Sequence, residues 1–537
     1  MKKSNFIIAA ALSFGLACMY MTYSKSSMNN ELKETHKTEN SEPTKSIPNS
    51  NKKPTPKPNS FNPSDAEKYQ KYIRKYTLAY DKNCILTLQD KYKGHGDLPL
   101  KIPVDNEINS LSEEVIACLY HRYVTTIQTF CAFKDRAGEA RRNGWYVCAD
   151  PAYAPKENGV VFLSNTAFPE STFSADMVSR YKSSIHATPL SSANTLQSWI
   201  HKTKTPNSVI DILTMSVSAT SGLGLIHTMV QEKSILKVKQ LFLELHFDPK
   251  DTKKQDYIQL LNSLRLLHDS GLRIVWFDRL FHCATTKFNK CYAVYFVQPN
   301  LRDKTATSLS LDLPSEEEIR KMKTTDITDL YFKYIETTQF FCQQVLRLGW
   351  ITDGGWDVCH DKMLQYRNPC IVYSFGVLND FSFDDEIAAT YDCSVYSFDP
   401  TTPFGTHQHS PRVWFYQLGI GSEYKKFGAG FIAPLKKIRA DLHHQSSPIT
   451  IVKADVEGAE WGSIPDMINT NELASVSQLY VEFHGKGDTP DQLLVLKKIH
   501  DAGFRIFWYH LNPACAHNKQ IPRRAECQEV YFINTKL

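Results

Sequence analysis

The sequence predicts an α/β protein with two tandem domains of one fold, preceded by an amino-terminal membrane anchor and a stalk. Short apolar runs that end in Gly, Pro or Asp alternate with helix-like segments, as in parallel sheets covered by helices. A series of segments in the first half recurs in the same order in the second half, which indicates an internal duplication. The chain has 537 residues, 42% of them hydrophobic, so it is long enough for two hydrophobic cores.

Residues 1–24 are predicted to be a signal anchor. Phe6 to Tyr23 is apolar and follows Lys2 and Lys3, so it can span a membrane with a cytoplasmic amino terminus. A cleaved signal peptide is the alternative, although Ala17-Cys18 is a poor cleavage site. In both cases the rest of the chain is expected in the secretory pathway, either as the lumenal or extracellular part of a single-pass type II membrane protein or as a secreted protein.

Residues 25–65 are predicted to be a disordered stalk. They are rich in Lys, Asn, Ser, Thr, Glu and Pro, and such a composition buries too little apolar surface to offset its ordering entropy. Two folded domains are expected to follow, at 66–310 and 311–537. The formal charge of +5 is small for this length and favours no nucleic-acid partner.

The duplication is visible in five pairs of segments that keep their order along the chain. They are Tyr120–Cys131 with Tyr331–Cys342, Gly144–Cys148 with Gly355–Cys359, Gln240–His246 with Gln478–His484, Gly271–Phe277 with Gly503–Tyr509, and Cys291–Val297 with Cys527–Ile533. The two halves are therefore expected to superpose as like folds.

The halves differ where polar site residues are expected. The first half has Thr188 where the second has Asp399, and it has residues 216–219, SVSA, where the second has residues 455–458, DVEG. A predicted strand at Val413–Leu418 has no obvious counterpart in the first half. Loss of carboxylates leaves polar ligand groups unpaired, so the first half is expected to be a degenerate domain without a cofactor.

Cys370 to Pro400 is predicted to form a strand, a tight turn, a helix and a second strand. The first strand, Ile371 to Phe375, runs into Gly376, where the backbone must turn sharply or let a ligand approach. The second strand, Ser394 to Phe398, ends on Asp399. An acidic residue at this place commonly accepts hydrogen bonds from two ribose hydroxyls.

A second stretch, Ile449 to Trp461, places Asp455, Glu457 and Glu460 after an apolar strand, where ligands of open α/β sheets bind. Together these stretches resemble a class I S-adenosylmethionine-dependent methyltransferase, and within that class an animal methyltransferase-like family. The shared elements are residues 374–376 (SFG), 379–384 (NDFSFD), 398–400 (FDP), 453–461 (KADVEGAEW) and 482–484 (EFH). The element at 455–458 also resembles FkbM-type sugar O-methyltransferases. The resemblance covers about residues 311–537.

The resemblance implies a Rossmann-like fold, S-adenosylmethionine as the cofactor, and O-methylation of a glycan or small-molecule hydroxyl. It implies that Ser374, Phe375, Gly376 and Asn379 line the methionine side of the cofactor and that Asp399 binds its ribose. The general class has a G-x-G-x-G after the first strand, whereas this chain has Gly376 alone, so the methionine end must be held differently. Neither Asp399 nor Asp211 of the first half is expected in the apolar core.

Several roles stay open for the acidic stretch. Asp455 is a candidate catalytic residue that accepts a proton from a hydroxyl substrate; it could also hold the cofactor amino group, bind a divalent cation or cap the next helix. Glu457 and Glu460 are candidate substrate-binding residues, although acids in the first turn of a helix are common. His484 is a candidate general base, but His246 of the first half retains its position, which favours a structural role. The chain contains no paired C-x-x-C, and no metal is predicted.

The cysteines indicate an oxidising compartment. Twelve of the 13 lie beyond the apolar segment, and an even number in a secreted chain indicates disulfides. The spacing that recurs in the two halves predicts four bridges: Cys131–Cys148, Cys342–Cys359, Cys283–Cys291 and Cys515–Cys527. Cys370 and Cys393 are left open between a bridge and buried thiols, and Cys84 and Cys118 remain by elimination.

Two other classes of function fit parts of the sequence. An anchor, a stalk and a lumenal α/β domain are also the layout of Golgi glycosyltransferases, which usually need a D-x-D-like site; Asp455 to Glu457 and Asp384 to Glu386 are the nearest candidates. A non-catalytic lumenal binding protein on a methyltransferase fold is the other alternative, since the first half has lost its carboxylates.

Overall fold

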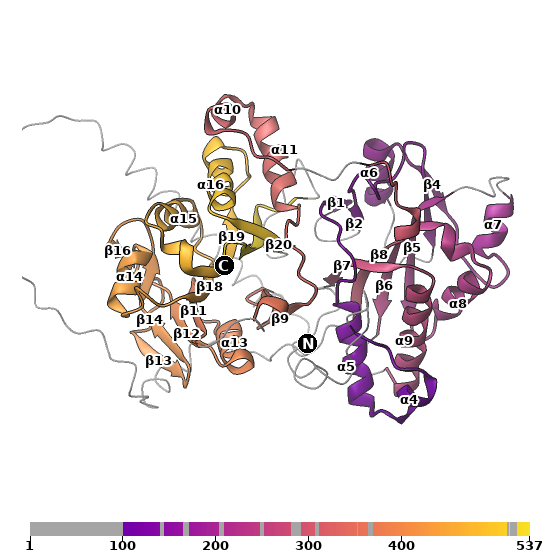
Figure 1. The fold of residues 1–537 in the computed structure, drawn as a ribbon, viewed down its shortest axis with the longest axis horizontal. Helices are drawn as coiled ribbons and strands as arrows, with labels where there is room; N and C mark the ends of the chain where they lie inside the picture. The colour runs from indigo at the N-terminus through magenta and orange to yellow at the C-terminus, as the bar shows by residue number, and fades with distance from the viewer. Residues whose placement is uncertain are drawn as a thin grey trace, which may run out of the picture. The chain divides into compact units, whose positions relative to one another are not determined.

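The structure is a computed structural model that describes residues 100–139, 144–164, 171–202, 209–247, 252–280, 291–306, 311–351, 353–363, 369–512, 515 and 524–537 (Figure 1). The predicted anchor and stalk lie outside these residues. In the part of the chain that the structure describes, no helix combines the length and the apolar character needed to cross a membrane.

The first half contains a six-stranded sheet with the strand order β4-β3-β5-β6-β8-β7. Its first four strands are parallel, and β8 is antiparallel to both β6 and β7. The strands are β3 (Val160–Ser164), β4 (Ser184–Ala187), β5 (Ile210–Ser218), β6 (Val238–His246), β7 (Arg273–Arg279) and β8 (Cys291–Val297). The helices are α4 (Asp105–Ser110), α5 (Glu113–Val124), α6 (Ser171–Tyr181), α7 (Leu196–Lys202), α8 (Leu223–Gln231) and α9 (Lys254–Asp269). Helix α9 contacts both α5 and α8.

The second half contains an eight-stranded sheet with the order β13-β14-β12-β11-β18-β19-β21-β20. The strands are β11 (Ile371–Phe375), β12 (Ser394–Phe398), β13 (His407–Ser410), β14 (Val413–Tyr416), β18 (Ile449–Ala454), β19 (Val476–His484), β20 (Phe504–Leu511) and β21 (Cys527–Asn534). The helices are α10 (Glu316–Lys321), α11 (Thr324–Ile335), α12 (His360–Met363), α13 (Ser382–Tyr391), α14 (Leu435–Asp441), α15 (Glu460–Asn469) and α16 (Pro490–Asp501). Helices α10, α11 and α15 all contact α16, whereas α13 contacts β12 and β14.

The two sheets follow one plan. The order β4-β3-β5-β6-β8-β7 corresponds strand by strand to β12-β11-β18-β19-β21-β20, with the same antiparallel pair at the end. A two-stranded ribbon precedes each sheet, β1 (Lys134–Ala137) with β2 (Trp145–Cys148) and β9 (Val345–Leu348) with β10 (Trp356–Cys359). The structure is therefore of the predicted α/β class, with like topology in its halves.

The second half has additional strands beside β12. Among the described residues the first half has no equivalent of β13 and β14, nor of a small sheet formed by β15 (Leu418–Ile420), β16 (Lys425–Phe427) and β17 (Gly430–Ala433). The single strand predicted at Val413–Leu418 is wrong. It ends at Tyr416, and Leu418 begins β15 in the small sheet, because the Gln417 amide donates to Thr406 Oγ1 and leaves the ladder.

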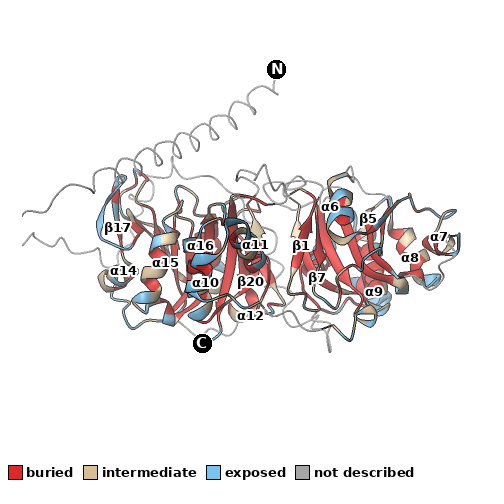
Figure 2. Ribbon diagram, turned by 90° about the horizontal axis from the view of Figure 1, so that it is seen from above, coloured by how far each residue is buried: buried red, intermediate tan, exposed pale blue. Residues whose placement is uncertain are grey.

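The sheets form because their strands are apolar on both faces. Every residue of β11 and β18 is buried, as expected for parallel strands covered by helices on both sides. Figure 2 shows most strands of the two large sheets in the buried class, whereas β4 at the edge of the first sheet is partly exposed. A local signal begins helix α16: the Thr489 side chain accepts from the Gln492 amide, and Pro490 is the first residue of the helix.

The described disulfides include three of the duplicated pairs, Cys131–Cys148, Cys342–Cys359 and Cys515–Cys527. The first two have Cα separations of 6.0 and 5.9 Å and each closes one two-stranded ribbon. The structure also contains Cys370–Cys393, which the sequence left open. Cys118 and Cys291 are disulfide-bonded; Cys84 and Cys283, the partners expected for them, lie outside the described residues. This density of bridges fits a secreted or lumenal protein.

Candidate active site

The candidate site lies at one edge of the second sheet, where the neighbouring parallel strands β12, β11, β18 and β19 end. Gly376 follows β11 with a φ of +76°, and a β-carbon there would overlap the carbonyl oxygen of Asp455. The Asp455 amide in turn donates to the Phe375 carbonyl at 3.1 Å. Glycine is therefore required at this position for two reasons, its left-handed backbone and the close approach of the neighbouring strand end.

Asp399 lies at the end of β12, beside the turn that follows Gly376. Its Oδ2 accepts from the Leu378 amide at 2.8 Å, and its Oδ1 accepts from the Thr401 amide at 2.8 Å and the Thr401 hydroxyl at 2.6 Å. The residue is 5% exposed. Oδ1 therefore has two donors and Oδ2 has one, so Oδ2 has more capacity to accept from a ribose hydroxyl. The binding of ribose hydroxyls by Asp399 stays a prediction.

Asp399 and Asp211 were not expected in the apolar core, and the structure adds that both residues are nevertheless nearly fully buried. Asp211 is 4% exposed, accepts from the Lys156 and Val160 amides, and lies 3.7 Å from Lys239 Nζ. It anchors the loop before β3, so its removal would disturb the first half.

The remaining predicted cofactor residues lie along β11 and the following turn. Ser374 and Phe375 are fully buried, and the Phe375 ring stacks on Phe398 at a centroid distance of 4.6 Å. The ring of Phe375 is thus a core element, and its backbone rather than its ring is placed at the edge of the sheet. Gly376 and Asn379 are half-buried in the turn.

Lys453 is a buried cation directly beneath this turn. Its Nζ donates to the Gly376 carbonyl at 2.9 Å and to the Phe375 carbonyl at 3.3 Å. It lies on β18, two residues before Asp455, and is 4% exposed. We infer that Lys453 orients the turn and balances part of the negative charge at the site.

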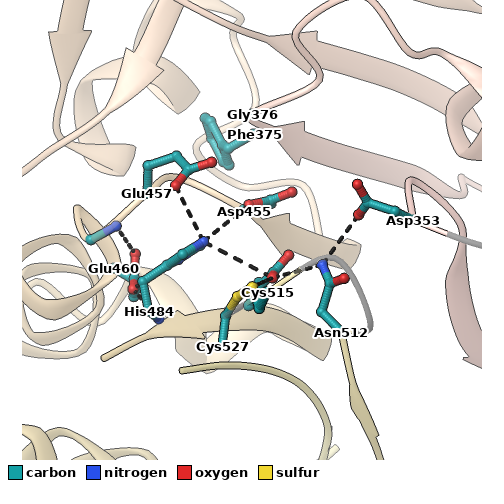
Figure 3. A network of polar contacts seen from close by, with 12 residues as sticks. Asp353, Phe375, Gly376, Asp455, Glu457, Glu460, His484, Asn512, Cys515 and Cys527 are labelled. Carbon is teal, nitrogen blue, oxygen red and sulfur yellow. Dashed lines mark hydrogen bonds and ion pairs between the residues drawn. A yellow bond between two sulfur atoms is a disulfide. The ribbon is translucent and has the colours of Figure 1, made fainter. Parts of the chain in front are cut away.

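His484, the last residue of β19, lies at the centre of a group of carboxylates (Figure 3). Its Nε2 lies 3.4 Å from Glu457, 3.9 Å from Asp455 and 4.0 Å from Glu482, and its Nδ1 lies 3.3 Å from Glu460. The structure thus brings the candidate residues of two strand ends and one helix start together around one imidazole.

Glu460 holds His484 in place, and its predicted role in substrate binding stays a prediction. It is fully buried at the start of α15; its Oε1 accepts from the His484 amide at 2.8 Å and its Oε2 from the Gly458 amide at 2.8 Å. Trp461 adds to this clamp by donating from Nε1 to the His484 carbonyl at 2.8 Å. Glu457, in contrast, has a side chain that is 69% exposed, so of the two predicted substrate-binding acids it is the accessible one.

The sequence did not single out two further members of the site, Asn512 and Asp353. Asn512, just after β20, donates from Nδ2 to Glu482 Oε1 at 2.9 Å and to Asp353 Oδ1 at 3.2 Å (Figure 3). The Cys515–Cys527 bridge lies against Glu482. A polar residue directly after a matched strand was the available signal for Asn512; Asp353 lies in a Gly-rich loop without such a signal.

The charges at the site determine its protonation. Burial opposes the charged imidazole, but the hydrogen bond and charge of Glu460, followed by the charges of Glu482 and Asp455, raise the pKa of His484 to about 10. Burial raises the pKa of Asp455 to about 7 and that of Glu482 well above its usual range, with the Asp455 charge adding to the latter. At neutral pH His484 is therefore a cation and Asp455 is close to its midpoint.

A protonated imidazole cannot accept a proton, so a cationic His484 favours Asp455 over His484 as the base. The catalytic roles of both residues stay predictions. The ligand atoms of Asp455, Glu457 and His484 lie within 4.8 Å of one another. They could hold a divalent cation only if His484 were neutral, since a metal ligand must be deprotonated.

Known proteins show what this half of the chain is similar to. A family model described as a methyltransferase domain matches residues 292–533. Two curated relatives, both named probable methyltransferase-like protein 24, from Homo sapiens and Rattus norvegicus, are each 26% identical over 237 residues, covering 38% of this chain and 64% of the relative. The chain thus spans less than two thirds of the length of these relatives.

Solved structures give weaker matches. The fibrillarin pre-rRNA processing protein of Methanococcus jannaschii is 8% identical, with 27% of this chain and 67% of that chain covered and a TM-score of 0.19. A Haemonchus contortus phosphoethanolamine N-methyltransferase 2, solved with S-adenosyl-L-methionine, is 9% identical, with 66% and 80% covered and a TM-score of 0.20. Scores this low carry no structural argument.

The family match supports S-adenosylmethionine as the cofactor, as predicted from the sequence, and it confirms the resemblance that residues 374–484 carry. Residues 292–533 are therefore similar to a methyltransferase domain, and the matched part of the chain is similar to the animal methyltransferase-like proteins.

Proposed function

We propose that the second half of the chain transfers a methyl group from S-adenosylmethionine to a hydroxyl of a glycan or small molecule, and that the first half is a degenerate copy without cofactor. One observation carries the proposal: Gly376, Asp399 and Asp455 meet at the ends of three adjacent parallel strands. Ligands of such sheets bind at this edge. The bound cofactor supplies an electrophilic methyl group.

The residues of the chain would bind the cofactor, orient the acceptor and remove the proton of its hydroxyl. Asp399 Oδ2 accepts one ribose hydroxyl, and the backbone at Gly376, held by Lys453, lets the methionine part approach. Asp455 takes the proton of the acceptor hydroxyl. The cationic His484 holds Asp455 and Glu457 in place, and the exposed Glu457 contacts the acceptor. Much of the rate would come from alignment of the hydroxyl with the methyl carbon.

The register of the strands supports the inactive first half. Met215 pairs with Leu243 on β6 as Ala454 pairs with Val481 on β19, so Ser216 takes the place of Asp455. The first half thus keeps the sheet and lacks the proposed base.

The compartment follows from the bridges, which fit an oxidising environment. Membrane attachment through residues 1–24 stays a prediction, which protease protection of the full chain in microsomes would test.

Calorimetry of the purified lumenal part, residues 66–537, with S-adenosylmethionine tests the cofactor. We expect one site per chain, since only one half carries Asp399 and Asp455. Two sites would disprove the inactive first half. No binding, with a nucleotide sugar bound instead, would favour the glycosyltransferase class, and no binding of either would favour a binding protein.

A further inference from the structure

The two halves of the chain contact each other through matching residues. We propose that they pack as the two subunits of a two-fold symmetric dimer do, and that the first half is a built-in partner that occupies a dimerisation surface of the second. The surface consists of residues 337–344 and Trp508 in the second half, and of residues 126–133 and Trp276 in the first. The kind of partner that it fits is another domain of this fold.

The backbone hydrogen bonds between the halves are reciprocal. The Ile127 amide donates to the Gln343 carbonyl at 2.8 Å, and the Thr338 amide donates to the Ala132 carbonyl at 2.8 Å. Within residues 126–133 the counterpart of each first-half residue lies 211 positions later, as for the duplicated cysteines Cys131 and Cys342. The same bond is therefore made twice with the roles of the halves exchanged, which defines an isologous contact.

The strand-like contacts repeat this exchange. Thr126 forms an antiparallel bridge with Gln344, and Phe133 forms one with Thr337. Thr126 corresponds to Thr337 and Phe133 to Gln344, so the two bridges are again images of each other. Four backbone contacts in two reciprocal pairs are what a two-fold axis imposes.

Residues that lie on a two-fold axis meet their own counterparts, and two such pairs are present. Phe130 and Phe341 contact edge to face at a centroid distance of 6.1 Å. Trp276 and Trp508, which match in the duplicated segments that include β7 and β20, stack at 3.5 Å. Both tryptophans are nearly fully buried, at 2% and 4% exposed. Separation of the halves would expose two of the largest apolar side chains.

Several side-chain contacts between the halves depart from the symmetry, and one of them gives the first half a specific task. Arg279 of the first half lies 3.2 Å from Asp357, which Arg347 contacts at 2.9 Å. The counterparts of Arg279 and Asp357 are Leu511 and Tyr146, so the reciprocal ion pair does not exist. Arg347 also lies 3.2 Å from Glu529, the strand neighbour of Glu482. A second copy of the second half would supply leucine here, so the first half contributes a charge that an identical partner would lack.

A full-length chain that can be cleaved between its halves tests the proposal. Cleavage at a protease site inserted after Ala306 breaks the covalent link between the halves. No described disulfide replaces this link, because each of the four described bridges joins two cysteines of the same half. After cleavage we expect a 1:1 complex by light scattering, with a measurable dissociation constant. Immediate separation of folded halves would overturn the proposal.

Mirrored substitutions test the two-fold relation itself. Trp276→Ala and Trp508→Ala remove the same stacked pair from opposite sides, so each should weaken the cleaved complex at least tenfold, by amounts that agree within about threefold. The double variant should be little worse than either. Leu236→Ala and Phe427→Ala, at exposed positions of the two halves, are matched controls and should change nothing. Independent, additive effects of the two tryptophan changes would disprove the shared contact.

A covalent readout covers variants that fold poorly. Phe130→Cys combined with Phe341→Cys should allow a short bifunctional thiol reagent to join the cleaved halves into one band on a non-reducing gel. Exposed Leu236→Cys with Phe427→Cys is the control and should not be joined. Absence of the joined band in the first pair, with both thiols reactive, would contradict the contact of equivalent residues.

Discussion

The ends of β6 and β19 carry the same pair of side chains in different surroundings. Glu244 and His246 end β6, and His246 Nε2 lies 3.1 Å from Glu244. Glu482 and His484 end β19, but there Asp455, Glu457 and Glu460 also lie within 4 Å of the imidazole. In the first half the strand register places Ser216 opposite Glu244. The Glu-x-His pair is therefore part of the scaffold, and the added carboxylates distinguish the half with the candidate site.

This comparison makes Asp455 the most sensitive position. We expect Asp455→Asn to lower the rate of methyl transfer from labelled S-adenosylmethionine to a hydroxyl acceptor by about 10²–10⁴-fold, because the proton acceptor is lost. Cofactor affinity by calorimetry should change less than tenfold. Ser216→Ala, at the equivalent place, should leave both unchanged. Full activity in folded Asp455→Asn would remove the base assignment.

Asp399 tests the cofactor side of the same comparison. Asp399→Asn keeps the shape of the side chain but removes its negative charge. A charge-assisted hydrogen bond from a ribose hydroxyl to this carboxylate would contribute about 1.5–3 kcal/mol to binding. Calorimetry should show S-adenosylmethionine binding weakened by roughly one to two decades. Thr188→Ala in the first half is the matched control. Unchanged affinity of Asp399→Asn would place the ribose elsewhere.

Substitutions of Gly376 and Gly458 distinguish two ways in which a side chain at positive φ destabilises the fold, namely backbone strain and steric overlap with a neighbouring strand end. A β-carbon at Gly458, with φ of +101°, meets nothing within 4 Å, whereas one at Gly376 meets the Asp455 backbone. Chemical denaturation should show Gly458→Ala destabilised by about 1–2 kcal/mol from backbone strain and Gly376→Ala by more than about 3 kcal/mol. Equal losses would mean that the close approach of the two strand ends does not exist.

The pH dependence tests the charges. The rate of methyl transfer should rise as the pH increases through about 7, because Asp455 ionises there. His484 should lose its positive charge near pH 10. Because the pKa of His484 in the folded state is above its ordinary value, its stabilisation is fully present below about pH 6.5 and is lost as the pH rises through about 10. Thermal melting of His484→Gln should accordingly differ from the parent at pH 7 and converge with it above pH 10, whereas His246→Gln should leave the activity profile unchanged. A pH-independent difference would rule out the cation.

Much of the fold could be predicted from the sequence. β11 and β12 were predicted with the bounds that the structure shows, because each is a continuous apolar run between turn residues. The break between β14 and β15 was missed, since Val413 to Leu418 is apolar except at Gln417 and the interruption there depends on a hydrogen bond from Gln417 to distant Thr406.

The sequence by itself determined the strands, the order of the segments that recur in the two halves, and the residue types at the strand ends. These features depend on near neighbours in the chain and on the periodic pattern of apolar residues. Only the tertiary structure decided the carboxylates that surround His484, the hydrogen-bond donors to Asp399, the burial of Glu460 and the stacking of Trp276 on Trp508. Each of these depends on groups far apart in the chain that meet at one place. A pKa, moreover, reflects the summed charge and burial around a group, which no local pattern contains.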